Sequence, residues 1–177
     1  VLHPGYPDPA GFGRRSRFCQ GTVLWRSLDA QRAVLPAVDW VKFHGALYND
    51  ATGDATLATA LIDWCRDAAV HGILLPPGSE LERAARAAGM DCWREGFADR
   101  RYALAGGRLA LAPRTLPDAV ITDPAAAVAQ VAEALRTGCL QVAGERLPLP
   151  CETWCVHSDS PQALATVQAL RRWAATC

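Results

Sequence analysis

The chain has 177 residues, of which half are hydrophobic, and its 18 basic side chains balance 18 acidic ones. This length allows one domain with a sizeable core and is short for two. A net charge of zero argues against nucleic acid or an anionic membrane as a partner, and no apolar run approaches the ~20 residues of a membrane-spanning helix. We therefore expect a single domain over residues 1–177 that binds neither nucleic acid nor membrane.

The first predicted elements are a strand and a helix. Residues 38–44 are apolar and β-branched, and a stretch rich in Gly, Asn and Asp follows them, which is typical of a buried strand that runs into a loop. Asp54 is a good N-cap for a helix. Beyond it, apolar residues recur at the three-and-four spacing of one helical face: Leu57, Leu61, Trp64, Cys65 and Ala68.

A second helix lies between two further predicted strands, at residues 72–76 and 92–97. Ser79 and Glu82 form a capping-box pattern that opens this helix, and Gly89 is placed to end it. Strand and helix therefore alternate over the first half of the chain.

The second half of the chain adds two hairpins and a strand. Residues 103–112 contain a Gly-Gly pair and predict a hairpin, and Gly144 with Glu145 predicts the turn of another. Residues 153–157 predict a fourth strand of the main series.

Two more helices are predicted in this half. Asp123 and Pro124 supply a cap followed by proline at the first helical position, and Gly138 closes that helix. The last helix starts at Ser160 and Pro161. The expected buried faces are Val128, Val131 and Leu135 in the first helix, and Leu164, Val167, Leu170 and Trp173 or Ala174 in the second.

Because strands and helices alternate, we expect parallel strands joined by right-handed crossover helices, in an α/β layer or barrel. The loops that leave the carboxyl ends of such strands converge on one face, so residues distant in sequence meet there. Side chains suited to catalysis stand at these strand ends: His3 and Asp8, Lys42 and His44, Asp99 and Arg100, and His157 and Asp159.

Each of these residues also has a purely structural interpretation. A strand-end histidine can cap a loop, Lys42 can be solvated, and Asp99 with Arg100 can form a loop ion pair. Three strand-end histidines, each beside a carboxylate or a lysine, favour a functional site. His71 differs from them because it ends a helix, where a polar or cationic side chain complements the helix carboxyl terminus.

The seven cysteines include no Cys-x-x-Cys pair, and no cationic leader with an apolar stretch precedes them. A reducing cytoplasm is therefore the expected location. Cys65, and with it most of the other cysteines, is expected to be a small buried hydrophobe. Cys151 and Cys155 could begin a metal site, but no second pair completes a tetrahedral set of ligands.

A loop at residues 4–13 combines three prolines with three glycines, and it could cradle an anion together with Arg14 and Arg15. The sequence contains neither a G-x-x-x-x-G-K-[ST] nucleotide loop nor a G-x-S-x-G nucleophile elbow. We therefore expect no nucleotide site within the chain itself and no serine nucleophile.

Four blocks of sequence, in order, resemble the LamB/YcsF family. They are residues 3–15 (HPGYPDPAGFGRR), 41–49 (VKFHGALYN), 97–102 (FADRRY) followed by Pro113 and Arg114, and 155–161 (CVHSDSP). The sequence departs from the family pattern at Phe43, Ala105 and Ser158, where proline, aspartate and glycine are usual. Between residues 17 and 38 we expect a shortened helix.

The resemblance implies an irregular (β/α) barrel similar to that of polysaccharide deacetylases. Family members begin with two further strands that carry a D-x-N-x-D-x-G-E stretch and a G-F-H-A-G-D loop, and neither pattern occurs in this sequence. We therefore expect an N-terminally truncated member whose incomplete barrel has an exposed edge.

The activity that the resemblance implies is hydrolysis of 5-oxoproline to glutamate, driven by ATP in a complex with subunits B and C. Opening a lactam requires a base for the water, a stabiliser for the oxyanion and an acid for the leaving nitrogen. We expect His44, or His157 with Asp159, to transfer protons, and Lys42 and Arg100 to stabilise anionic oxygen, with Asp99 as a further catalytic residue. The expected substrate-binding residues are His3, Asp8, Tyr6, Arg14, Arg15, Asn49, Arg100 and Arg114.

Two alternatives stay open on the sequence alone. In a metal-dependent hydrolase of the deacetylase kind, His3, His44, His157 and a carboxylate would bind a divalent cation and activate its water. In the other alternative, the chain is an inactive fragment that keeps only an interface for its partners.

Overall fold

The computed structural model describes residues 1–16, 21–35 and 37–177, so Cys19 lies outside the described residues. The chain forms two compact units, Val1–Arg94 and Glu95–Cys177. The expectation of a single domain over the whole chain stays a prediction.

Parallel strands form the centre of the first unit. Strand β1 (Trp40–Val41) pairs with β2 (Gly72–Leu75), and β2 pairs with the first four residues of β3 (Asp91–Phe97). Strands β1 and β2 consist of apolar residues and glycine, and they contribute to the core of this unit. Completely buried side chains on and beside them are Val41, Phe43, Ile73 and Leu75.

The start of the chain runs beside β1 in the same direction. Leu2 forms a parallel bridge with Val41. The backbone N–H groups of Lys42 and His44 donate to the carbonyl oxygens of Leu2 and Pro4, each at 2.8 Å. The predicted first strand is therefore present, and its second half is bonded to this N-terminal segment.

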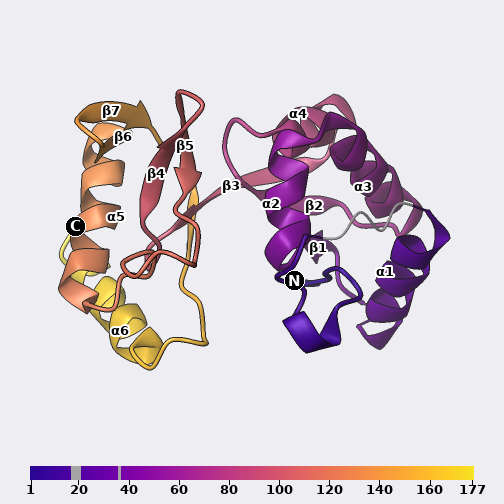
Figure 1. Ribbon diagram of the computed structural model, residues 1–177, viewed down its shortest axis with the longest axis horizontal. Helices are drawn as coiled ribbons and strands as arrows, with labels where there is room; N and C mark the ends of the chain where they lie inside the picture. Colours follow the sequence, from indigo (N-terminus) through magenta and orange to yellow (C-terminus); the bar gives the residue numbers. More distant parts are fainter. Residues whose placement is uncertain (17–20, 36) are drawn as a thin grey trace. The chain divides into compact units, whose positions relative to one another are not determined.

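Helices lie around these strands in Figure 1. Those of the described part of the first unit are α1 (Thr22–Val34), α2 (Gly45–Gly53), α3 (Ala55–Asp67) and α4 (Glu80–Ala87). The segment for which a shortened helix was expected contains α1, which is 13 residues long. Residues 17–20 and 36 of that segment lie outside the described residues.

The helix starts predicted from capping residues are confirmed in this unit. The Asp54 carboxylate accepts hydrogen bonds from two backbone N–H groups at the start of α3. The Ser79 hydroxyl accepts from the backbone N–H of Glu82 at 3.0 Å at the start of α4. The Glu82 carboxylate accepts from the N–H of Gly78, one residue earlier than a standard capping box.

The prediction of a loop after the first strand is wrong, because residues 45–53 form helix α2. Its Gly, Asn and Asp residues have weak helix propensity, which favoured a loop in the sequence. Leu47, Tyr48 and Ala51 on one side of α2 are buried. Tertiary packing of an apolar face outweighs weak propensity in a helix of this length.

The second unit contains the end of β3 and three further pairings. Glu95–Phe97 of β3 pairs in parallel with β8 (Thr153–Cys155). Both predicted hairpins are confirmed, and they consist of β4 (Tyr102–Ala105) with β5 (Arg108–Leu111) and β6 (Cys139–Val142) with β7 (Glu145–Pro148).

Helices α5 (Pro124–Thr137) and α6 (Ala163–Ala174) pack against each other in this unit (Figure 1). Helix α5 begins at the predicted Asp123 cap, and Gly138 ends it with a φ of 68°. Within its predicted face, Val131 is buried but Leu135 is 56% exposed.

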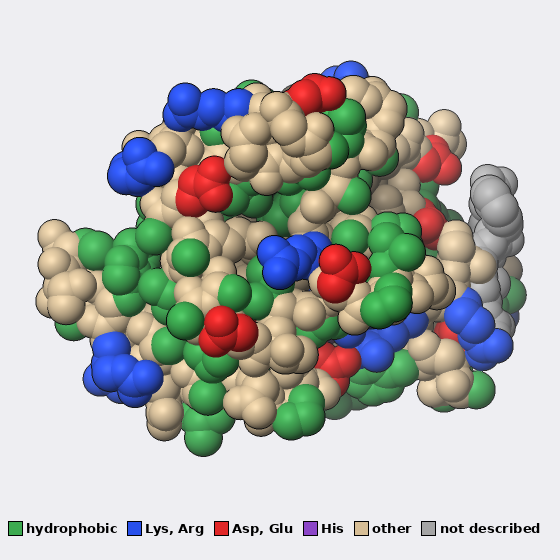
Figure 2. Space-filling model, turned by 60° about the vertical axis from the view of Figure 1, so that its left-hand side comes forward, with side chains coloured by type: hydrophobic (Ala, Val, Ile, Leu, Met, Phe, Trp, Pro, Cys, Tyr) green, Lys and Arg blue, Asp and Glu red, His purple; other side chains and the backbone are tan. Residues whose placement is uncertain are grey.

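The predicted buried face of α6 is wrong in part. Leu164 and Val167 are 70% and 48% exposed, whereas Thr166 is 2% exposed. The spacing of apolar residues predicts that a helix has an apolar stripe, but the neighbouring elements decide which side is covered. Figure 2 shows hydrophobic side chains at the surface of the face it draws, among charged and other polar groups.

The observed class is α/β, as predicted, with parallel strands in the order β1-β2-β3-β8. The crossovers between these strands contain helices, as the alternation in the sequence indicated. Over the described residues, no helix is both long and apolar enough to cross a bilayer.

Candidate active site

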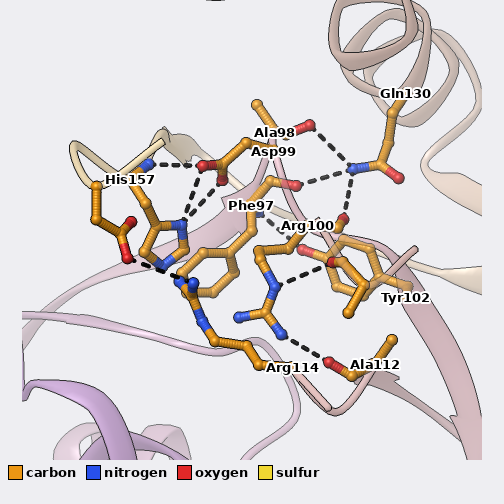
Figure 3. Close-up of polar contacts among 11 residues, drawn as sticks. Phe97, Ala98, Asp99, Arg100, Tyr102, Ala112, Arg114, Gln130 and His157 are labelled. Carbon is orange, nitrogen blue, oxygen red and sulfur yellow. Dashed lines mark hydrogen bonds and ion pairs between the residues drawn. The ribbon is translucent and has the colours of Figure 1, made fainter. Parts of the chain in front are cut away.

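The predicted site residues fall into two groups, one in each unit. In the second unit, Asp99 and His157 each follow one of two adjacent parallel strands, β3 and β8. The backbone N–H of His157 donates to Oδ2 of Asp99 at 2.8 Å, and its Nδ1 lies 3.0 Å from Oδ1 (Figure 3). The carboxylate is an acceptor, so Nδ1 carries the hydrogen and Nε2 is left for proton exchange.

Asp99 is only 2% exposed. Burial alone would raise the pKa of its carboxyl group, but the hydrogen bonds from the His157 side chain and backbone outweigh burial and lower that pKa below its ordinary value. The carboxylate therefore stays charged at neutral pH. The Phe97 ring stacks on the His157 ring at 5.5 Å with 17° between the planes, which fixes the imidazole from a second side.

Two arginines lie beside this pair. The Arg100 guanidinium is buried and donates from Nε to the carbonyl of Ala119 at 3.2 Å and from Nη2 to that of Ala112 at 2.6 Å. Burial, and then the positive charge of Arg114, lower the pKa of Arg100. Arg114 Nη1 lies 3.5 Å from Asp159. Asp159, which we expected to act with His157, thus contacts Arg114, while Asp99 is the carboxylate bonded to His157.

Gln130 binds the backbone at the end of β3, and the sequence did not mark it as a site residue. Its Nε2 on α5 carries two hydrogens and lies within hydrogen-bond distance of three carbonyls at the end of β3, so one N–H is shared. The distances are 2.9 Å to Phe97, 3.3 Å to Ala98 and 3.0 Å to Arg100 (Figure 3). These carbonyls flank Asp99. The sequence offered only a polar residue within an alanine-rich helix, so no local signal pointed to this role.

Glu95 is a second residue that the sequence did not mark as part of the site, because it lies in a strand that also contains Asp91 and Arg94. It lies on β3 and is 3% exposed. Nearby, the Tyr102 hydroxyl accepts a hydrogen bond from the Phe97 N–H at 2.8 Å. Burial raises the pKa of Tyr102 strongly, with a smaller contribution from the Glu95 charge.

In the first unit, His3 and His44 form a chain of hydrogen bonds between two loops. His3 Nδ1 lies 2.7 Å from the Lys42 carbonyl, His44 Nε2 lies 2.7 Å from the Phe12 carbonyl, and the two rings meet at 3.0 Å through His3 Nε2 and His44 Nδ1. Each outer nitrogen must carry a hydrogen to bind a carbonyl. The inner contact is a hydrogen bond only when one ring carries a second proton, so the pair then holds one positive charge.

Asp8 lies in the loop at residues 4–13, and its carboxylate forms an ion pair with Arg15, just beyond the loop. The Asp8 carboxylate is buried and accepts from Nε and Nη2 of Arg15 at 3.0 and 2.6 Å, and from the Gly11 N–H at 3.0 Å. This contact raises the pKa of Arg15. Both side chains thus have a structural task in the loop, and their expected role in substrate binding stays a prediction.

Other expected residues of this unit have contacts beyond the two histidines. The Tyr6 hydroxyl donates to Asp50 at 2.9 Å. Asn49 is exposed on α2. The Arg14 guanidinium lies over the Phe12 ring, 5.3 Å from its centroid. The structure therefore brings His3 next to His44, and Asp99 next to His157, Arg100 and Arg114, while Arg14 packs on Phe12, which itself contacts His44.

Metal ligation finds no support in either group. Across the described parts of the chain, no cluster of three His, Cys, Asp or Glu side chains is arranged to hold a metal ion. The contacts of His3 and His44 are to each other and to carbonyl oxygens. A divalent metal, like ATP, stays a prediction.

Comparison with known proteins gives relatives over almost the whole chain. The 5-oxoprolinase A subunit of Symbiobacterium thermophilum is 41% identical over 183 residues, which cover 96% of this chain and 67% of that protein. The corresponding protein of Methylococcus capsulatus is 40% identical over 179 residues, with 96% and 68% covered.

A solved structure shares the fold. The crystal structure of the lactam utilization protein from Thermus thermophilus matches with a TM-score of 0.77 and 30% identity, over 97% of this chain and 73% of that one. The sequence profile of the LamB/YcsF family matches residues 2–176. The chain therefore belongs to the LamB/YcsF family.

Proposed function

We propose that this chain is the A subunit of a 5-oxoprolinase and that it takes part in opening the lactam ring of 5-oxoproline to give glutamate. The buried Asp99–His157 pair carries the proposal. It stands at the ends of adjacent parallel strands, in a chain about 40% identical to proteins named as the A subunit of 5-oxoprolinase. ATP would be hydrolysed in a complex with subunits B and C, because this sequence has no nucleotide-binding loop.

The chemistry of the reaction matches what this pair offers. A water must lose a proton as it attacks the lactam carbonyl, and the ring nitrogen must gain one as the C–N bond breaks. His157 Nε2 can take the first proton and deliver the second. Asp99 holds Nδ1–H in place and stabilises the imidazolium that forms between the two steps.

A cation beside the pair supplies the remaining requirement. The tetrahedral intermediate carries negative charge on oxygen, and fixed positive groups in a partly buried site stabilise it without reorganising. Arg100 is the group assigned to this role, because two carbonyls hold its guanidinium in place. The expected contribution of Lys42 belongs to the first unit and stays part of the proposal.

Turnover in the assembled complex tests this function. Glutamate formation from 5-oxoproline is measured with subunits B and C, with and without ATP. We expect the wild type to require ATP and His157→Ala to lose roughly 10²–10⁴-fold in kcat. Gln168→Ala, on the exposed surface of α6, is a matched control outside the site. Undiminished turnover in His157→Ala would exclude the assigned role, and an inactive wild-type complex that still assembles would favour the inactive-fragment alternative.

A further inference from the structure

Arg114 has a weak contact that a ligand carboxylate can replace. Its Nη1 lies 3.5 Å from Oδ2 of Asp159, at the outer limit of hydrogen-bond distance. The two side chains are 32% and 40% exposed, so water screens their attraction. A carboxylate that accepts two parallel N–H bonds from one guanidinium is held more firmly than by a single long contact.

A second guanidinium makes the same place favourable for an anion. Arg100 is 6% exposed, and its Nε and Nη2 are anchored on carbonyls, which leaves Nη1 outside both contacts. Burial and then the Arg114 charge lower the pKa of Arg100, while the charges of Asp99 and Asp159 raise it. Two like charges held together in a partly buried site repel each other, and an anion near both relieves that repulsion.

The two arginines lie in the same site as Asp99 and His157, the pair to which proton transfer is assigned. Arg100 follows Asp99 directly in the sequence, and Asp159 follows His157 by two residues. Figure 3 draws both guanidinium groups together with Asp99 and His157. A small ligand held by its carboxylate at the arginines would thus have the rest of its ring near the imidazole.

We propose that Arg114 binds the carboxylate of a small cyclic amide, and that Asp159 contacts Arg114 in the absence of that ligand. The inference rests on the proposed function and specifies its substrate class: lactams that carry a carboxylate, of which 5-oxoproline is one. The carboxylate contact orients the ring, because 5-oxoproline is small and rigid. The site therefore selects against lactams that lack the acid group.

Calorimetric binding to the assembled complex tests the proposal with two probes, 5-oxoproline and 2-pyrrolidinone, which is the same ring without its carboxylate. In Arg114→Gln we expect the affinity for 5-oxoproline to fall roughly tenfold or more, and the affinity for 2-pyrrolidinone to stay within about twofold. Arg114→Lys keeps the charge without the bidentate geometry, so we expect an intermediate loss. Thermal unfolding confirms that each variant is folded.

Arg86→Gln is the matched control, since it removes an exposed guanidinium that is bonded to Glu82 on α4. We expect it to bind both probes like the wild type. Unchanged binding of 5-oxoproline in Arg114→Gln would overturn the proposal, as would an equal loss for both probes or a wild-type complex that binds neither. Carboxylate-dependent binding in a complex that forms no glutamate would support this site while contradicting the proposed function.

Discussion

Asp99 shows how one residue can be buried and still carry a charge. A carboxylate removed from water is costly unless several donors replace the lost hydration. His157 supplies two of these donors, from its backbone and its ring. The same contacts that keep Asp99 ionised also fix the orientation of the imidazole, so stability and the proposed chemistry depend on the same pair.

Replacing Asp99 by asparagine tests this coupling through the pH dependence of stability. The folded protein holds the Asp99 pKa below its ordinary value of 3.8. The stabilising contribution is therefore fully present above that pH and is lost as the pH falls through the lower folded-state value. We expect Asp99→Asn to lower the free energy of unfolding by about 1–3 kcal/mol at pH 7.

Urea unfolding from pH 7 down to pH 2 measures the effect, and the difference between wild type and variant should shrink at the acid end of the series. Asp63→Asn on the exposed side of α3 serves as the control. A difference that stayed constant across the whole pH range would contradict the charge-based account.

At the scale of elements, helix α5 fixes the end of β3 through a single side chain. The Gln130 amide lies within hydrogen-bond distance of three carbonyls that flank Asp99, and such a contact positions Asp99 without touching a substrate. Strand ends carry reactive groups in parallel sheets, but their loops lack the ladder bonds that hold a strand. An amide from a neighbouring helix replaces those bonds here.

Substituting Gln130 by methionine removes the donors at similar size. We expect Gln130→Met to cost about 1–3 kcal/mol in stability, because the carbonyls lose a buried partner. We also expect kcat for the proposed reaction to fall more than KM rises, with a shifted pH profile of kcat, since Asp99 would no longer hold His157. Gln168→Met on α6 is the control. An unaltered pH profile together with reduced stability would leave Gln130 a structural role only.

The loop at residues 4–13 and the start of α2 come into close contact at Gly13 and Gly45. Gly45 has a φ of +58°, and a Cβ there would come within 2.6 Å of the Gly13 carbonyl oxygen. Gly53, at the other end of α2, has open space around it and no positive φ. The two glycines therefore offer a matched pair of substitutions in one helix.

We expect Gly45→Ala to destabilise the protein by about 1–3 kcal/mol or more, through backbone strain and the clash with residue 13. Gly53→Ala should be neutral or stabilise by up to about 1 kcal/mol, since alanine only restricts the unfolded chain. Thermal unfolding of both variants checks the contrast. Equal effects at the two positions would show that the loop does not approach α2 as closely as described.

On the scale of the whole molecule, positive and negative side chains are mixed. The net charge is zero at pH 7, and Figure 2 shows Lys and Arg side chains interspersed with Asp and Glu on the face it presents. Proteins repel one another least when their net charge is near zero. The charge distribution thus gives a prediction about the chain in solution.

We expect the solubility of the isolated chain to be lowest near pH 7 and to rise on either side. Below pH 7 the chain gains protons and a net positive charge, and above pH 7 it loses protons and becomes negative, since its sequence pI is about 7.0. Precipitation by polyethylene glycol at constant ionic strength measures this dependence across the pH range. A solubility that changes in one direction only would contradict the prediction.

The sequence alone predicted the α/β class, the parallel series of strands, both hairpins and the capped helix starts. These features depend on short-range signals, namely apolar periodicity, N-cap residues and turn glycines, which can be seen without knowing the fold. Helix α2 and the covered side of α6 could not be predicted in this way. In both cases a neighbouring element decided which residues were buried, against local propensity or local periodicity.

The residue types of the candidate site, and their places at strand ends, were likewise determined by the sequence, as were the blocks that resemble the LamB/YcsF family. Only the tertiary structure decided the partners. It paired His157 with Asp99 in place of Asp159, tied His44 to His3 and Phe12, and placed Gln130 behind the end of β3. Hydrogen bonds depend on distances of a few ångströms between residues far apart in sequence, and only the packing of strands and helices sets those distances.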